Sequence, residues 1–207
     1  MASSSRSFFR SAGVAVRLTV LSTVVLGVAY PLAVWGVGQA AFHDQANGST
    51  VTDLSGKVVG SSLIGQSFDG KGADRWFQSR PSAAGGKGTA LSGGYGADAS
   101  SGSNLGPSNP DLTKAVEERR AAIAKADGVP ASEVPADALT ASGSGLDPDI
   151  SPEYAAQQVA RVAAARGVSE ARVRALVTEH TDGRQLGVLG APAVNVLALN
   201  LALAKLG

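Results

Sequence analysis

Residues 18–42 read LTVLSTVVLGVAYPLAVWGVGQAAF, and this run of 25 residues carries no formal charge. An α-helix rises about 1.5 Å per residue, so the run would be roughly 37 Å long and could cross a hydrocarbon layer of about 30 Å with some tilt. It predicts one transmembrane helix. Residues 1–17 then form a short N-terminal segment, and residues 44–207 form a soluble domain beyond the membrane.

Two features of the run predict how this helix is shaped and packed. Pro31 has no N–H to donate to the carbonyl of Gly27, so a helix kink is expected at Pro31. Small side chains spaced four residues apart let a second helix approach closely. The run therefore predicts packing against a partner helix through Ala29, Ala33, Gly36 and Ala40.

The charges outside the run predict its orientation. Arg6, Arg10 and Arg17 are the charged side chains that precede His43. Basic flanks stay on the cytoplasmic side, so the N-terminus is expected inside and the soluble domain outside. All 17 acids and the other 15 lysines and arginines follow His43, which gives that part a formal charge of −2. This charge argues against nucleic-acid binding.

A cleaved signal peptide is the alternative interpretation of the N-terminal run. Leu18–Val28 would be its apolar core, and the small residues of Gly38-Gln39-Ala40 would precede the cut, which would release an exported binding protein. The apolar run continues well past Val28, which favours a retained anchor. The chain has no cysteine, so disulfides and thiolate metal sites are excluded, but a domain of about 160 residues can bury its own core.

The soluble domain is predicted to be α+β and rich in helices, with a small β-hairpin over residues 50–64. Residues 82–109 are rich in glycine and serine, and composition alone would assign them to a linker. Helix N-cap patterns follow at Asn109-Pro110, at Ser151-Pro152 and at Ser169. A fourth helix is expected to start at Pro192, although residues 194–203 also alternate partly like a strand.

No residue pattern predicts catalysis or a metal site. Leu91-Ser92-Gly93-Gly94 resembles the first four residues of the signature sequence of ATP-binding cassettes, and backbone amides in such a loop could cradle a phosphate. No helical pattern follows it, and short matches arise easily in glycine-rich sequence. Asp147-Pro148-Asp149 could hold a cation or form a turn before Ser151, and His180 is expected to be a packed or capping residue.

Five strings of residues occur together and in one order. Combined with the single N-terminal span, they make the chain similar to the C subunit (KdpC family) of the bacterial Kdp potassium-transporting P-type ATPase. The similarity covers nearly the whole chain, including residues 82–109, which in this light are expected to be ordered. The strings are residues 60–66, 76–84, 101–110, 140–152 and 194–200.

The resemblance implies a complex in the bacterial inner (cell) membrane. Its other members would be a channel-like potassium-translocating subunit, a P-type ATP-hydrolysing subunit and a small single-span peptide. The C subunit would be a non-catalytic assembly component, described as a catalytic chaperone that raises the ATP affinity of the hydrolysing subunit. ATP and potassium would be handled by the complex. By this resemblance, Leu91, Ser92, Gly93 and Gly94 are the candidates for nucleotide contact.

This chaperone role conflicts with the predicted topology, because ATP is cytoplasmic and only residues 1–17 are expected inside. Direct contact by Gly93 and Gly94 would require them on the inner face. Coupling through the kinked span is physically easier, provided that two conformations of the pump bind this helix differently. A further possibility places the slightly acidic outer domain over the ion entrance.

Overall fold

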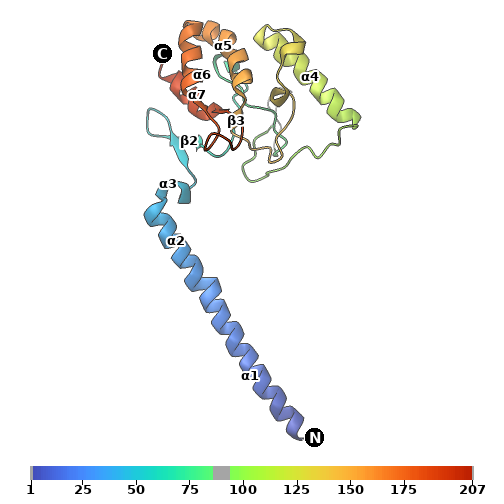
Figure 1. Ribbon diagram of the computed structural model, residues 1–207, viewed down its shortest axis with the longest axis vertical. Coiled ribbons are helices and arrows are strands. Elements are labelled where there is room, and N and C mark those ends of the chain that lie inside the picture. The colour runs from blue at the N-terminus through green and yellow to red at the C-terminus, as the bar shows by residue number, and fades with distance from the viewer. Residues whose placement is uncertain (1, 86–93, 207) are drawn as a thin grey trace. The chain divides into compact units, whose positions relative to one another are not determined.

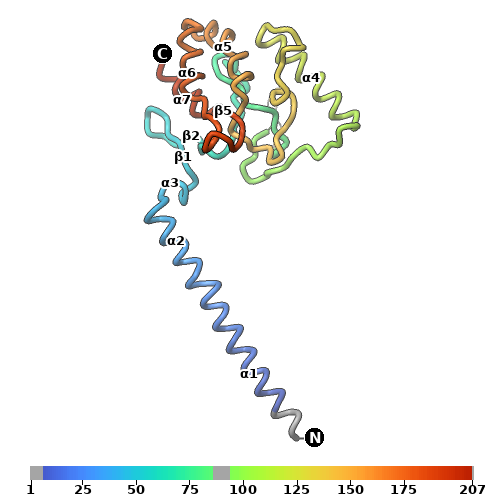
Figure 2. Tube along the Cα trace, in the orientation of Figure 1, coloured from blue at the N-terminus to red at the C-terminus, as the bar shows by residue number. Residues whose placement is uncertain are grey.

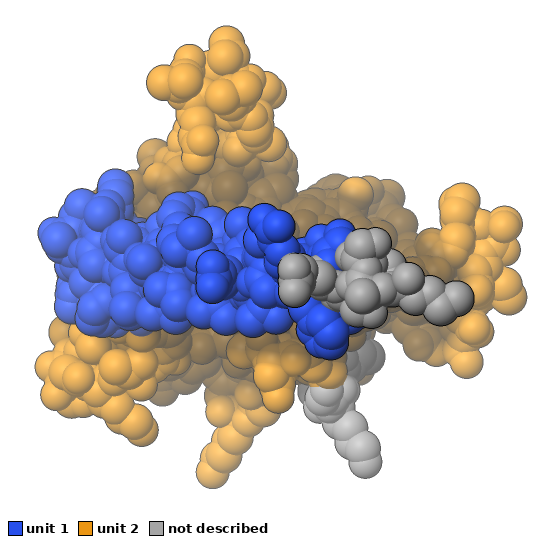
Figure 3. Space-filling view, turned by 90° about the horizontal axis from the view of Figure 1, so that it is seen from below, with its two compact units in different colours: residues 1–49 blue, residues 50–207 orange. Residues whose placement is uncertain are grey.

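The computed structural model describes residues 2–85 and 94–206, with side chains described from Ser7 onward. The chain divides into two compact units, residues 1–49 and 50–207, which are coloured separately in Figure 3.

Unit 1 is helical almost throughout. It contains α1 (Ala2–Val24), a π-helical turn η1 (Val25–Ala29), α2 (Tyr30–Ala41) and the short α3 (His43–Ala46) (Figure 1). Among the described residues, one helix, Ser7–Ala41, is long and apolar enough to cross a membrane. The helix thus begins well before Leu18, the predicted start of the span.

The helix changes its hydrogen bonding immediately before Pro31. The Tyr30 N–H donates to the carbonyl of Val25, which is the i to i+5 pattern of a π-turn. Pro31 has no backbone N–H to donate to the preceding turn of the helix. A local change from α-helical to π-helical hydrogen bonding is one way in which a helix adapts to a proline. The kink at Pro31 stays a prediction.

Unit 2 begins with the predicted β-hairpin. β1 (Thr50–Thr52) pairs antiparallel with β2 (Val58–Ser61). Asp53 Oδ1 organises the turn by accepting hydrogen bonds from the N–H groups of Ser55 at 2.8 Å and Lys57 at 3.0 Å. β2 ends at Ser61 instead of reaching Ile64, because the Ser61 carbonyl and hydroxyl accept hydrogen bonds within a following turn.

Three of the predicted helices are confirmed, with their caps. They are α4 (Pro110–Asp127), α5 (Pro152–Arg166) and α6 (Glu170–Glu179). Their N-cap side chains each accept a backbone N–H from the first turn, which satisfies a group that has no partner inside the helix. These N-caps are Asn109, Ser151 and Ser169, and α4 and α5 end at the left-handed glycines Gly128 and Gly167.

The start predicted for the fourth helix is wrong. α7 spans Val196–Ala204, and Asn195 is its N-cap, accepting from the Ala198 N–H at 3.0 Å. Residues Ala193–Asn195 form β5 instead, the middle strand of a sheet with β3 (Asp149–Ile150) and β4 (Thr181–Asp182). Asp149 begins β3, and its N–H donates to Asp147 Oδ1 at 3.1 Å, which is the hydrogen bond of an Asx turn. The turn expected at residues 147–149 is therefore confirmed. The partial strand alternation of residues 194–203 corresponds to a strand only at residues 194 and 195, because α7 begins at Val196.

The core of unit 2 surrounds α5. α5 packs against α6 and α4 and against the 3₁₀ turn η2 (Ala73–Arg75), and two further 3₁₀ turns follow α4, η3 (Ala131–Glu133) and η4 (Ala136–Ala138). The buried side chains are mostly aliphatic and come from segments between Phe77 and Leu203, with none from β1 or β2. They include Phe77, Ile123, Leu139, Ile150, Tyr154, Val159, Val162, Val173, Val177, Val194, Leu199 and Leu203.

Two buried side-chain amides hold the extended segment 76–81 against this core. Asn200 of α7 accepts a hydrogen bond from the Phe77 N–H and donates one to the Phe77 carbonyl, each at 2.9 Å. Gln158 of α5 does the same for Gln78, at 2.7 and 3.1 Å. Asn200 and Gln158 are 2% and 0% exposed. The amides thus supply the hydrogen bonds that a neighbouring strand would otherwise provide.

A buried ion pair joins α4 to α5. Arg161 Nε donates to Asp127 Oδ1 at 2.7 Å, and the Arg161 and Asp127 side chains are 11% and 3% exposed. Arg161 Nη2 also donates to Gln158 Oε1 at 2.7 Å. The other terminal nitrogen, Nη1, meets the carbonyls of Ala73, Asp74 and Trp76. One guanidinium therefore connects α4, α5 and the segment that precedes Phe77.

Candidate functional site

The glycine- and serine-rich region is hydrogen-bonded to the segment at residues 144–145. The Ser82 hydroxyl oxygen lies 2.5 Å from each of the carbonyl oxygens of Gly94 and Gly145. The Ser101 N–H donates to the Ser144 carbonyl at 2.9 Å and the Ser100 hydroxyl donates to it at 3.0 Å, so residues 100 and 101 lie beside Ser144, where two loops of unit 2 come together (Figure 2). The described part of 82–109 is therefore an ordered segment, and the linker expected from composition is wrong for it.

Glycine is required where these segments approach each other. Gly145 has φ +68°, a conformation that favours glycine, and a Cβ there would lie 2.7 Å from the Ala84 nitrogen. A Cβ on Gly65 would lie 2.6 Å from the Tyr95 ring. The glycine content of this region thus serves close backbone packing, at least at these two positions.

Arg80 and Tyr95 tie the same region to Asp147. Arg80 Nη1 lies 2.7 Å from Asp147 Oδ2 in a partly exposed ion pair, and the Tyr95 hydroxyl donates to the Arg80 carbonyl at 2.6 Å. Burial raises the pKa of Tyr95 to about 12. The Tyr95 hydroxyl therefore stays protonated near neutral pH, which suits a structural hydrogen bond and not a nucleophile.

Of the four residues proposed for nucleotide contact, the structure describes Gly94. Leu91, Ser92 and Gly93 lie outside the described residues. Gly94 is followed by coil, and the next described helix, α4, begins at Pro110. The Gly94 carbonyl faces the Ser82 hydroxyl. Nucleotide contact at these residues stays a prediction.

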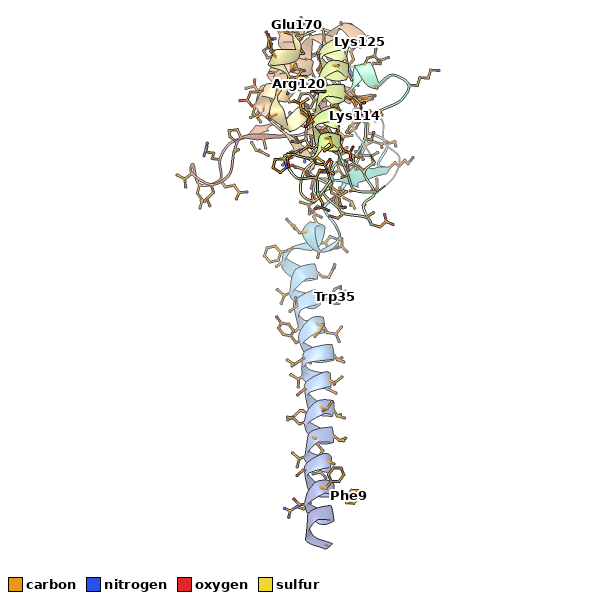
Figure 4. All side chains as sticks on the ribbon, turned by 90° about the vertical axis from the view of Figure 1, so that its right-hand side faces the viewer. Phe9, Trp35, Lys114, Arg120, Lys125 and Glu170 are labelled. Atoms are coloured by element: carbon orange, nitrogen blue, oxygen red, sulfur yellow. The ribbon has the colours of Figure 1, made fainter. Side chains whose placement is uncertain are left out.

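Four of the small residues of the span lie on one face of the helix. Ala29, Ala33, Gly36 and Ala40 are separated by four, three and four residues, a spacing that keeps side chains aligned at 3.6 residues per turn. A Cβ built on Gly36 would meet nothing within 4 Å. Large apolar side chains elsewhere on the helix are exposed within the described chain. Phe9 and Trp35, for example, are 71% and 64% exposed (Figure 4). Unit 1 therefore presents an apolar surface with one flat stripe.

The His, Asp and Glu side chains are the remaining candidates for a metal site. Within residues 2–85 and 94–206, no group of three or more His, Asp or Glu side chains could hold a metal ion. The His180 ring nitrogen Nδ1 lies 3.0 Å from the Leu176 carbonyl at the end of α6, which agrees with the expected capping role. A cavity of about 660 Å³ separates the β1–β2 turn from α7, and its lining includes His180 and Lys205 among mostly apolar groups.

The carboxyl of Asp149 gives a pH-dependent prediction. Burial raises its pKa, the charge of Asp147 adds to the rise, and a 3.2 Å hydrogen bond from Asn195 opposes it. A carboxyl with a raised pKa stabilises the fold below its ordinary pKa of about 4, and this stability is lost as pH rises through the raised value.

Asp149→Asn removes that ionisation. The midpoint temperature of unfolding of the variant, relative to wild type, should therefore rise as the pH is raised above the ordinary carboxyl pKa of about 4. Thermal unfolding followed by Trp fluorescence measures this difference, with Asp98→Asn at an exposed carboxyl as the control. A difference that does not change with pH would contradict the prediction.

Comparisons with known proteins match nearly the whole chain. A sequence model of the family described as KdpC, the K⁺-transporting ATPase c chain, matches residues 12–205. A protein of Kineococcus radiotolerans is 57% identical over 197 residues, which are 95% of this chain and 94% of that protein. A protein of Caulobacter vibrioides is 55% identical, covering 88% and 87%.

A third relative, from Mycobacterium tuberculosis, is 51% identical over 193 residues, covering 93% of this chain and 96% of the relative. All three proteins are described as the potassium-transporting ATPase KdpC subunit.

Proposed function

Because the chain belongs to the KdpC family, the c chain of the K⁺-transporting ATPases, we propose that it is the accessory and assembly subunit of such a pump. Residues 18–42 retain it in the bacterial inner membrane. Its N-terminus lies in the cytoplasm, and residues 44–207 lie outside. Its partners are a channel-like potassium-translocating subunit, an ATP-hydrolysing P-type subunit and a small single-span peptide. Those partners handle potassium and ATP.

The apolar surface of unit 1 is the observation that carries this proposal. No residue in the most apolar part of the helix Ser7–Ala41 is buried within the chain. Its side chains therefore need lipid or another helix as their environment. Lipid alone would not explain a stripe of small residues, whereas close helix packing uses such residues directly. The stripe is therefore assigned to a helix of a partner subunit.

The same helix offers a route for an effect on ATP affinity. ATP is cytoplasmic, and unit 2 lies on the opposite side of the membrane in this topology. An effect that passes through the span needs no direct contact between unit 2 and ATP. Two conformations of the pump that pack differently on the stripe would be coupled to this chain by the difference in packing free energy. The π-turn at Val25–Ala29 lies inside the span, where such a difference can be accommodated locally.

Enlarging the stripe should prevent assembly. The double variant Gly36→Leu/Ala40→Leu places two branched side chains where close helix approach is proposed. The amounts of the potassium-translocating and ATP-hydrolysing subunits that co-purify with the chain should fall at least about tenfold, which corresponds to roughly 1.4 kcal/mol.

The control for this experiment is Val34→Leu/Ala41→Leu. At about 100° per residue, both positions lie well away from the stripe, so co-purification should be unchanged. Equal assembly of the stripe variant and the control would refute the role of the stripe. Failure of the wild-type chain to co-purify with either subunit would refute the proposed function itself.

A further inference from the structure

The connection between β4 and β5 projects from unit 2 as a closed, hydrogen-bonded loop (Figure 4). Gln185 and Leu189 exchange backbone hydrogen bonds in both directions, each at 2.9 Å. The Gly187 N–H also donates to the Arg184 carbonyl at 3.1 Å. Residues 184–189, called the apolar loop below, therefore have a defined conformation.

The side chains of the apolar loop face solvent. Leu186, Val188 and Leu189 are 90%, 73% and 56% exposed. Single exposed aliphatic residues are common on protein surfaces, but three within four positions of one tight loop form a contiguous apolar patch. Because these three side chains are not buried, they add little hydrophobic stabilisation to the fold of unit 2.

The backbone conformation at Leu186 is also unfavourable for a leucine. Its φ is +52°, in the left-handed region that glycine and asparagine adopt readily and that costs other residues roughly 1–2 kcal/mol. A leucine here is thus poorly suited both to its conformation and to its exposure. A local cost without a return inside the chain points to a function outside it.

We propose that the apolar loop inserts into an aliphatic pocket on another subunit of the ATPase, on the side of the membrane where unit 2 lies. This inference rests on the proposed function and adds a second contact to the one made by the span. Because the loop is already closed by hydrogen bonds, little conformational entropy is lost when it docks.

The positive charge of the apolar loop indicates which groups should surround the pocket of the partner subunit. Arg184 is the one ionisable residue among residues 183–192, and it is exposed. A carboxylate beside the pocket would complement it with charge-assisted hydrogen bonds. The chemistry expected of the partner is therefore aliphatic at the centre and acidic at the edge.

The composition of the loop disfavours the bilayer as its partner. Residues 181–195 contain no Trp or Tyr, the side chains that membrane-interface segments use most. One arginine also supplies little attraction to anionic lipid compared with the polybasic segments that anchor proteins at membranes. A subunit pocket is the better match to three aliphatic side chains on a fixed loop.

The first test replaces the loop side chains without disturbing the fold. Leu186→Asn/Val188→Thr should leave the midpoint temperature of unfolding unchanged or higher, because asparagine tolerates the left-handed conformation. Co-purification of the other ATPase subunits should fall at least tenfold. The control is Leu54→Asn, at a leucine that is 75% exposed on the β1–β2 turn. Co-purification of the loop variant at the wild-type level would overturn the proposal.

The second test identifies what covers the loop. The chain has no cysteine, so Leu186→Cys provides a single site for a polarity-sensitive fluorophore. Its emission should shift to the blue in the assembled complex, but not for the chain alone in detergent or in vesicles containing anionic lipid. A shift in vesicles without the other subunits would assign the loop to the bilayer. A shift in detergent that depends on concentration would assign it to a second copy of the chain, and either outcome overturns the proposal.

These outcomes are separable from failure of the proposed function. If the wild-type chain assembles with the pump while the loop variant also assembles, only the inference about the apolar loop is lost. If the wild-type chain does not assemble, the proposed function falls first.

Discussion

Asn200→Leu should lower the free energy of unfolding of unit 2 by roughly 2–6 kcal/mol, because two buried backbone groups lose their partners at about 1–3 kcal/mol each. Asn200 is nearly fully buried and makes both hydrogen bonds of the Phe77 backbone, each at 2.9 Å. Leucine has the same branching and the same number of side-chain heavy atoms as asparagine, and a good helix propensity, so lost hydrogen bonding is the main change.

Denaturant unfolding of the full-length protein in detergent measures this effect through the fluorescence of Trp76, which neighbours the affected bond. Ala198→Leu adds the same side chain to a partly exposed position of α7 and should change the free energy by less than about 0.5 kcal/mol. A loss at Asn200→Leu no larger than that of the control would show that the amide does not hold segment 76–81.

Arg161→Leu should be comparably severe, at about 3–5 kcal/mol, because it leaves a buried carboxylate without its cation. The Asp127 side chain is 3% exposed, and its remaining partner is Gln157 Nε2 at 2.7 Å. The carbonyls of Ala73, Asp74 and Trp76 lose the Arg161 donor as well. Arg172→Leu, at an exposed arginine of α6, is the control and should have little effect.

The pH dependence separates the charge effect from lost packing. In Arg161→Leu the buried Asp127 carboxylate has lost its cation, and adding a proton removes the buried charge, so the variant should recover stability relative to wild type as the pH falls. Adding Asp127→Asn should recover part of the loss at neutral pH for the same reason. A loss that is independent of pH and is not relieved by Asp127→Asn would rule out the buried charge as its cause.

The elements that were predictable from sequence are those set by local hydrogen bonds. Asn109, Ser151 and Ser169 each cap the helix that follows within a few residues, so their patterns were sufficient. The α7 start was predicted wrongly because Pro192 resembled a first helical residue. β5 instead pairs with β3 and β4, and β3 lies more than forty residues earlier in the chain, beyond any local pattern.

The contacts of the glycine-rich region and of segment 76–81 were not predictable for the same reason. Ser82 reaches Gly145, and Asn200 reaches Phe77, across separations of 63 and 123 residues. Asn200 gave the one available signal, since it is a lone polar residue in the otherwise apolar helix VLALNLALA. The apolar span, in contrast, depends on composition within one continuous segment and was evident from the sequence.

In the proposed topology, a retained N-terminal span holds unit 2 outside the cell membrane. Single cysteines can test this claim because the chain has none. In Lys114→Cys the new thiol replaces a side chain that is 74% exposed on α4 (Figure 4), and in Ser7→Cys it lies near the N-terminus. A membrane-impermeant maleimide added to intact spheroplasts should modify Lys114→Cys at once, and Ser7→Cys only after the membrane is opened. Modification of Ser7→Cys in intact spheroplasts, with Lys114→Cys protected until lysis, would contradict the account.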